Sequence, residues 1–215
     1  GDLDVSVIDE LPPGRKKITT KHYTGDQVEL AFSHVRREID GGAQAYVVYP
    51  VIEESETQAM KAATAMHQHL AADVFPDIEV GLLHGKMSAA DKEAAMDAFK
   101  TGRTKILVSS TVIEVGVDVP NATVMVIEQA ERFGLSQLHQ LRGRVGRGGS
   151  QSYCLLVTEK LGDTGKERIR TMVDSQDGFE IAEMDLKLRG PGEFFGTKQS
   201  GLPSQIGRAS CRERV

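Results

Sequence analysis

The chain has 215 residues, a formal net charge of −5 and 40% hydrophobic residues, which is enough for one sizeable core. No apolar run reaches the length of a membrane span, and residues 1–10 lack the layout of a signal peptide. Cys154 and Cys211 form neither a metal-ligand spacing nor a disulfide framework. We therefore expect a cytoplasmic protein with no membrane contact, in which a local basic patch must meet any polyanion.

Both ends of the sequence suggest a piece of a longer polypeptide. The chain begins at Gly1, directly before the apolar run "LDVSVIDE". Residues 206–215, "IGRASCRERV", have neither apolar periodicity nor turn residues in a meaningful order. They look like an in-frame translation of a sequencing-library adapter, and we expect them to be non-native.

The central part of the sequence alternates between helical and strand patterns. From Thr24 onward apolar residues recur with a helical period until Gly41 and Gly42, where the helix should stop. Ser88, with Asp91 three residues later, predicts the capped start of another helix that ends at Gly102. We expect a further helix over 55–72 and strands over 44–52, 78–83, 105–109, 123–128 and 152–159.

This alternation predicts an α/β fold with a parallel sheet covered by helices on both faces. Functional residues in such a sheet are expected at the carboxyl ends of the strands. Two unusual segments follow predicted strands. Residues 110–120, "STVIEVGVDVP", combine hydroxyl groups and a glycine with one carboxylate at Asp118, and residues 137–149, "QLHQLRGRVGRGG", contain three arginines and four glycines.

The arginine-rich segment is typical of polyphosphate binding. Arg144 and Arg147 are three residues apart and should lie on one face of a helix that also carries Gln140 and Arg142. Two guanidinium groups at this spacing can bind phosphate oxygens in a bidentate manner. The alternatives are a solvated basic patch, or a clamp on a nucleic acid backbone without chemistry.

Four segments together resemble the motifs of superfamily 2 helicases. "QLRGRVGR" resembles the sixth motif, "STVIEVGVDVP" the fifth, "QAYVVYPVIEES" the fourth, and "LLHGKM" the short motif between them. In order and spacing, residues 44–149 are similar to the second RecA-like lobe of these motors. The resemblance implies an ATP site between two lobes, with the phosphate loop and the magnesium-holding acid on the other lobe.

A narrower resemblance covers nearly all of residues 1–205. "FGLSQLHQLRGRVGR" is similar to the branch that holds RecG and the transcription-repair coupling factor. Residues 166–201 resemble the helical hairpin and loop that both share, and "RGPGEFFGTKQSGLP" is closer to RecG. The opening "GDLDVSVIDELPPGRKKITT" resembles the RecG connection between its motor lobes. The implied division is an inter-lobe connection (1–20), a RecA-like lobe (21–160), a helical hairpin with a translocation loop (161–205) and the adapter-derived tail (206–215).

The resemblance also implies roles for individual residues. Arg144 and Arg147 would be catalytic arginine fingers, and Gly116, Asp118 and Gln140 would face the nucleotide. Contacts to the DNA backbone would come from Gly85, Lys86 and Thr111. The residues that couple ATP turnover to movement would be Arg168, Arg189 and Gln199; alternatively, the two arginines simply pair with acids such as Glu180 or Asp185.

The implied function is that of the C-terminal half of an ATP-dependent double-strand DNA translocase, or helicase. Such a motor remodels branched DNA, including stalled forks and Holliday junctions, in recombination and repair. ATP and Mg²⁺ would be held mainly by the other lobe, and the implied partners are branched DNA and the N-terminal RecA-like lobe and wedge domain of the same monomer. The chain alone should be inactive.

Other classes of protein fit less well. A dinucleotide-binding enzyme would need a glycine-rich turn after its first strand, whereas Gly41 and Gly42 precede a strand. The sequence has no G-x-x-x-x-G-K-[ST] motif, and its histidines do not cluster at metal-ligand spacings, so we expect no metal ligand. A binding module without motor activity would explain the arginines but not the hairpin. The coupling factor, which would add RNA polymerase as a partner, remains the nearest competitor.

Overall fold

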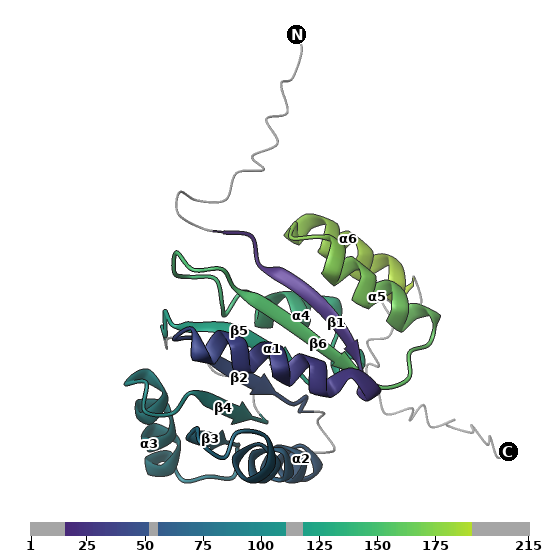
Figure 1. The fold of residues 1–215 in the computed structure, drawn as a ribbon. Helices are drawn as coiled ribbons and strands as arrows, with labels where there is room; N and C mark the ends of the chain where they lie inside the picture. The colour runs from purple at the N-terminus through teal and green to yellow at the C-terminus, as the bar shows by residue number, and fades with distance from the viewer. Residues whose placement is uncertain (1–15, 52–55, 111–117, 191–215) are drawn as a thin grey trace, which may run out of the picture.

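The computed structural model describes residues 16–51, 56–110 and 118–190. They form a six-stranded parallel sheet flanked by helices, in the strand order β1-β6-β5-β2-β4-β3 (Figure 1). This confirms the predicted fold class. The strands are β1 (Thr19–Thr24), β2 (Gln44–Val48), β3 (Val80–Leu83), β4 (Ile106–Ser109), β5 (Ala122–Ile127) and β6 (Tyr153–Thr158).

Helices cover both faces of the sheet. In Figure 1, α1 crosses in front of the strands and α4 lies behind them. The helices are α1 (Val28–Asp40), α2 (Glu56–His69), α3 (Ala89–Lys100), α4 (Leu135–Arg142), α5 (Asp163–Asp174) and α6 (Gly178–Arg189), with short turns η1 (Gly25–Gln27), η2 (Leu70–Val74, a π-helix) and η3 (Ala130–Arg132).

The sheet separates two hydrophobic clusters. On one face, Phe32 of α1 and Phe75 pack edge to face with ring centroids 6.2 Å apart, among side chains from α1 and α2. On the other face, Phe99 of α3 packs against Tyr46, and Leu138 of α4 and Ile181 of α6 join the same cluster. The hairpin of α5 and α6 is therefore packed onto the lobe through a shared core.

Most predicted elements are confirmed within a few residues of their expected bounds. The Ser88 side chain accepts a hydrogen bond from the backbone N–H of Asp91 at 3.1 Å, as the capping pattern predicts. The expected boundary between residues 20 and 21 falls inside β1, a strand that the sequence analysis missed. β1 pairs only with β6 at the edge of the sheet, so its polar sequence "TTKHYT" lacks the apolar run of a central strand.

No helix in the described ranges is long and apolar enough to cross a membrane. Within the same ranges, no group of three or more histidine, cysteine, aspartate or glutamate side chains could hold a metal ion.

Candidate functional site

The arginine-rich segment is a loop after α4 rather than part of the helix. α4 ends at Arg142, where the N–H of Gly143 donates to the carbonyl of His139 at 3.0 Å. Gly146 has a φ of +79°, in the left-handed region that favours glycine. The expectation that Arg144 and Arg147 share a helical face is therefore wrong, because the glycines end the helix first.

This loop, residues 143–149, lies toward the amino ends of the strands. A Cβ on Gly146 would come within 3.0 Å of the Ile18 side chain, just before β1, and one on Gly148 within 3.3 Å of the carbonyl oxygen of Pro120, just before β5. α4 has carried the chain back across the sheet from the carboxyl end of β5. The prediction that this segment lies at the carboxyl ends of the strands is therefore wrong.

The charges of three predicted ATP-site residues act on one buried side chain of the sheet. Burial raises the pKa of Tyr46 to about 12, the charges of Arg144 and Arg147 lower it, and that of Asp118 raises it. These three charges come from two separate loops. Among the described residues no carboxylate pairs with Arg144 or Arg147 within 4.0 Å.

Arg144 and Arg147 differ in their exposure to solvent. Arg144 is half-buried, whereas Arg147 and Asp118 are exposed, as is Gln140 on the last turn of α4. Two cationic side chains without a carboxylate partner among the described residues suit a polyphosphate anion. They do not suit a metal ion, since Asp118 is the one described carboxylate that acts on Tyr46 together with them. Gly116 lies outside the described residues.

Arg142 has a different environment from the other two arginines. Its side chain is only 2% exposed, and it donates to the carbonyl of Met172 at 2.7 Å and to the hydroxyl of Thr20 at 3.2 Å. A hydrogen bond of 3.1 Å joins it to Nδ1 of His139, and burial lowers its pKa. Arg142 therefore connects α4 with β1 and α5.

The residues expected to contact DNA lie at the opposite, carboxyl end of the sheet. Gly85 and Lys86 follow β3, and the Lys86 ammonium donates to the Thr57 hydroxyl at 2.9 Å. The N–H of Ser110 donates to the carbonyl of Leu83 at 3.1 Å, so the segment after β4 begins next to the Gly85–Lys86 turn. Thr111 itself lies outside the described residues.

Both arginines of the hairpin contact the segment that leads into α4. Arg168 of α5 donates to the carbonyls of Glu131 and Phe133 at 3.4 and 3.5 Å. The Arg189 guanidinium lies 3.6 Å from the Cβ position of Gly134 and pairs with Asp185 at 3.2 Å.

The alternative prediction, that Arg168 and Arg189 form ion pairs with nearby acids, is confirmed for Arg189 but not for Arg168. Among the described residues no carboxylate pairs with Arg168, and Glu180 instead accepts a hydrogen bond from Ser175 at 2.6 Å. Asp185 also accepts from Ser136 of α4 at 3.1 Å, which ties α6 to α4. The third expected coupling residue, Gln199, lies outside the described residues.

The turn between α5 and α6 is fixed to the start of β1. Gln176 Nε2 donates to the carbonyl of Ile18 at 2.6 Å. The side chain of Ile18 also packs against Gly146. Gln176 was not among the residues predicted from the sequence to have a role. The segment before β1 thus contacts both the arginine loop and the hairpin turn.

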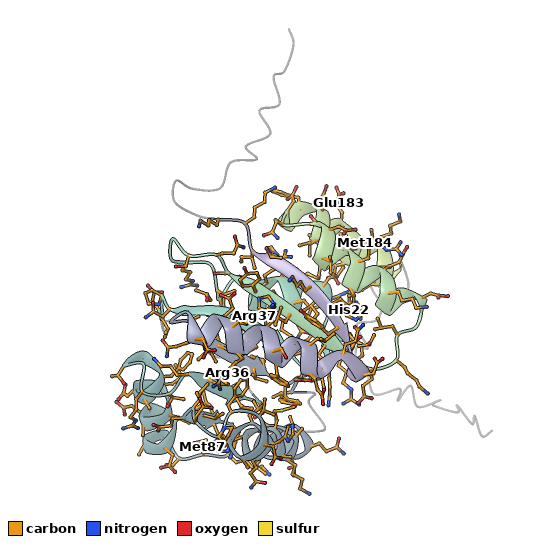
Figure 2. All side chains as sticks on the ribbon, viewed as in Figure 1. His22, Arg36, Arg37, Met87, Glu183 and Met184 are labelled. Atoms are coloured by element: carbon orange, nitrogen blue, oxygen red, sulfur yellow. The ribbon has the colours of Figure 1, made fainter. Side chains whose placement is uncertain are left out.

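Histidines near these contacts have environments that favour the neutral form. Burial and the nearby Arg142 lower the pKa of His139 on α4, and burial lowers that of His22 on β1, labelled in Figure 2. His22 Nε2 shares a hydrogen bond of 2.6 Å with the hydroxyl of Thr158 on β6. Both histidines are engaged in hydrogen bonds within the lobe.

Comparison with protein families identifies the lobe. The model of the helicase conserved C-terminal domain matches residues 29–149, and that of ATP-dependent DNA helicase RecG, domain 3, C-terminal, matches residues 175–211. ATP-dependent DNA helicases RecG from Synechocystis sp. and Thermotoga maritima are 61% and 56% identical over 94% of the chain. The chain spans only 24% and 26% of those relatives.

Solved structures agree with this assignment. A structure of RecG bound to a three-way DNA junction superposes with a TM-score of 0.71 at 51% identity, covering 86% of this chain and 24% of that one. Domain 2 of the DEAD-box helicase Mss116p, bound to an RNA duplex, shares the fold at 18% identity with a TM-score of 0.59, covering 80% of this chain and 69% of that one. The chain therefore belongs to the helicase conserved C-terminal domain family, on its RecG branch.

Proposed function

We propose that the chain is the second motor lobe of an ATP-dependent double-strand DNA translocase that remodels branched DNA in recombination and repair. The observation that carries this proposal is that the charges of Arg144, Arg147 and Asp118 act together on the buried Tyr46, in a lobe whose RecG relatives are ATP-dependent helicases. The complete enzyme would act as a monomer in the cytoplasm, with the N-terminal RecA-like lobe and wedge domain in the same polypeptide.

In this proposal ATP lies between the two lobes and against residues 143–149. Arg144 and Arg147 bind the phosphate oxygens and stabilise the charge that develops on the transferred phosphoryl group, an effect of about 10³ to 10⁵ in the rate of related NTPases. Gln140 and Asp118, with Gly116, position the nucleotide. Mg²⁺, which neutralises phosphate charge in such reactions, would be held by the other lobe, because the described residues include no metal-binding group.

DNA would pass over the opposite edge of the lobe. Lys86 and Gly85, together with Thr111, contact the sugar-phosphate backbone, which gives affinity without sequence preference. ATP and DNA thus contact opposite ends of the same sheet. Closure of the lobes would be relayed by the hairpin, whose Arg168 and Arg189 hold the start of α4, and by Gln199 in the loop that follows.

The nearest alternative function is that of a transcription-repair coupling factor. The match of residues 175–211 to the RecG domain 3 model favours the RecG assignment. A DNA-binding module without motor activity is disfavoured because it gives no role to Arg144 and Arg147, which have no carboxylate partner among the described residues.

Phosphate release tests the two-lobe assignment. The 215-residue chain alone should hydrolyse no measurable ATP with or without branched DNA, since its sequence holds no phosphate-loop motif. The complete polypeptide should show hydrolysis that branched DNA stimulates. Robust DNA-stimulated hydrolysis by the chain alone would contradict the proposal.

A further inference from the structure

A cavity of about 230 Å³ opens at the carboxyl ends of the neighbouring strands β6, β5 and β2. Tyr49 lines it after β2, Glu128 and Gln129 after β5, and Thr158 and Glu159 at the end of β6, while the start of α1 closes one side. None of these residues belongs to the candidate ATP or DNA contacts.

The cavity lies where the winding of the sheet reverses. After β2 the chain moves toward β4 and β3, whereas after β5 it moves the other way toward β6. In open α/β sheets, ligands bind in the crevice outside the carboxyl ends of strands at such a switch point. Tyr49 and Glu128 are the residues that directly follow these two strands.

Glu128 is a buried acid without a compensating partner. It is only 7% exposed, and no described residue forms a hydrogen bond with its Oε1 atom. The charges that act on it are those of Glu131 and Glu159, both acidic, and burial together with these charges raises its pKa to about 7. A buried carboxylate of this kind is costly unless an opposite charge joins it.

The size and charge of the cavity limit its ligand. Small-molecule pockets usually measure about 300–1,000 Å³, so a cavity of about 230 Å³ can enclose only a small chemical group. Three glutamates nearby repel phosphate. The nearby His22 already shares its Nε2 hydrogen bond with Thr158, so it supplies no free cation.

We propose that this cavity binds one organic cation, a guanidinium or ammonium group, through Glu128, with Tyr49 and Glu159 as its neighbours. The cation comes either from a basic side chain of an adjoining polypeptide segment or from a free amine. The inference does not depend on ATP hydrolysis, so it and the proposed function can fail separately.

Binding of the cation ionises Glu128 and releases its proton. The groups that act on this carboxyl are Tyr49 directly after β2, Glu131 of η3 and Glu159 after β6, and His22 of β1 lies beyond Thr158. With a pKa of about 7, Glu128 is about tenfold less ionised at pH 6 than at pH 8. Affinity for the cation should therefore be about tenfold higher at pH 8 than at pH 6.

The experiment is an NMR titration of the backbone amides of Gln129 and Glu159 with ethylguanidinium and, separately, ethylammonium. The neutral N-ethylurea controls for shape. We expect saturable shifts at pH 8, an affinity about tenfold weaker at pH 6, and loss of binding in Glu128→Gln. Glu167→Gln, a change of the same kind at an exposed site on α5, should leave them intact.

Comparison of the chain with the complete polypeptide distinguishes the two sources of the cation. Binding to the chain but not to the complete polypeptide supports a basic side chain that already fills the cavity, and binding to both supports a free amine. The proposal is overturned if neither cation binds the chain at pH 8, if N-ethylurea binds equally well, or if Glu128→Gln leaves binding unchanged.

Discussion

At the scale of single residues, environment separates three arginines that look alike in the sequence. Arg142, Arg144 and Arg147 lie within six positions, yet only Arg142 is enclosed by its own lobe. Its guanidinium donates to the Met172 carbonyl and the Thr20 hydroxyl, and no carboxylate among the described residues forms an ion pair with it. Arg142 therefore stabilises the fold, whereas the other two remain available to a ligand.

Replacement of Arg142 should destabilise the lobe. Arg142→Met keeps much of the side-chain volume but leaves the Met172 carbonyl without its donor, and we expect a loss of about 2–4 kcal/mol in the free energy of unfolding. Arg144→Met, the matched control, should change it by less than about 0.5 kcal/mol. Urea unfolding measures both values, and equal losses would contradict this assignment.

Glu128 should make stability depend on pH. Its pKa is raised from about 4.5 in the unfolded chain to about 7 in the fold, so the folded state binds the proton more tightly. The stability that this group contributes is present below pH 4.5 and is lost as pH rises toward 7. Glu128→Gln should therefore be more stable than the wild type at pH 8 and show no such gain at pH 4. A gain of equal size at both pH values would contradict the raised pKa.

At the scale of secondary-structure elements, local sequence signals define some helix ends well. The Ser88 hydroxyl caps α3, and Ser88→Ala should cost about 1 kcal/mol. Ser33→Ala is a suitable control, because the Ser33 hydroxyl donates to the Glu29 carbonyl within α1 and caps no helix end. Thermal unfolding of the two variants should separate them by several degrees. Equal melting temperatures would argue against the cap.

The hairpin of α5 and α6 should affect movement more than hydrolysis. Arg168 holds the carbonyls of Glu131 and Phe133 at the start of α4, so Arg168→Ala should loosen the hairpin from the helix that precedes the arginine loop. In the complete polypeptide we expect the number of base pairs unwound per ATP to fall at least fivefold. Arg170→Ala, an exposed arginine on the same helix, should leave this ratio unchanged, and an equal fall in both variants would make the hairpin merely structural.

Periodicity predicted five of the six strands, including β3 at one edge, but missed β1 at the other edge. Strands β2, β4, β5 and β6 are continuous apolar runs because both faces of the sheet are covered. β1 is polar and lies at the edge, so no such run marks it. α4 ends earlier than expected because Gly143 and Gly146 stop it, and Gly146 is fixed by a φ of +79° and by contact with Ile18.

At the scale of the whole molecule, the resemblance to superfamily 2 helicases identified candidate site residues, but the sequence could not show which of them lie close together in the fold. Asp118 and Arg144 are far apart in the chain, and only the return of α4 toward the amino ends of the strands brings them near Tyr46. The Glu128 cavity had no sequence signal at all, since it depends on which strands are neighbours. Gln176 was missed for the same reason.

If ATP and DNA bind at opposite ends of the sheet, as proposed, the hairpin can couple the two sites. The arginine loop lies toward the amino ends and the Lys86 turn at the carboxyl ends, so a signal between them must cross the lobe. α4 spans that distance. Its start contacts Arg168 and Arg189, and Arg142 ties its last turn to α5.

The most direct test of this account is the ATPase rate of Arg144→Ala in the complete polypeptide, measured with saturating branched DNA. If Arg144 is an arginine finger, the rate should fall by about 10³-fold or more while the affinity for DNA changes less than about threefold. Arg37→Ala, an exposed arginine on α1 at the other face of the sheet, is the control and should keep its rate. A near-normal rate in Arg144→Ala would contradict the account.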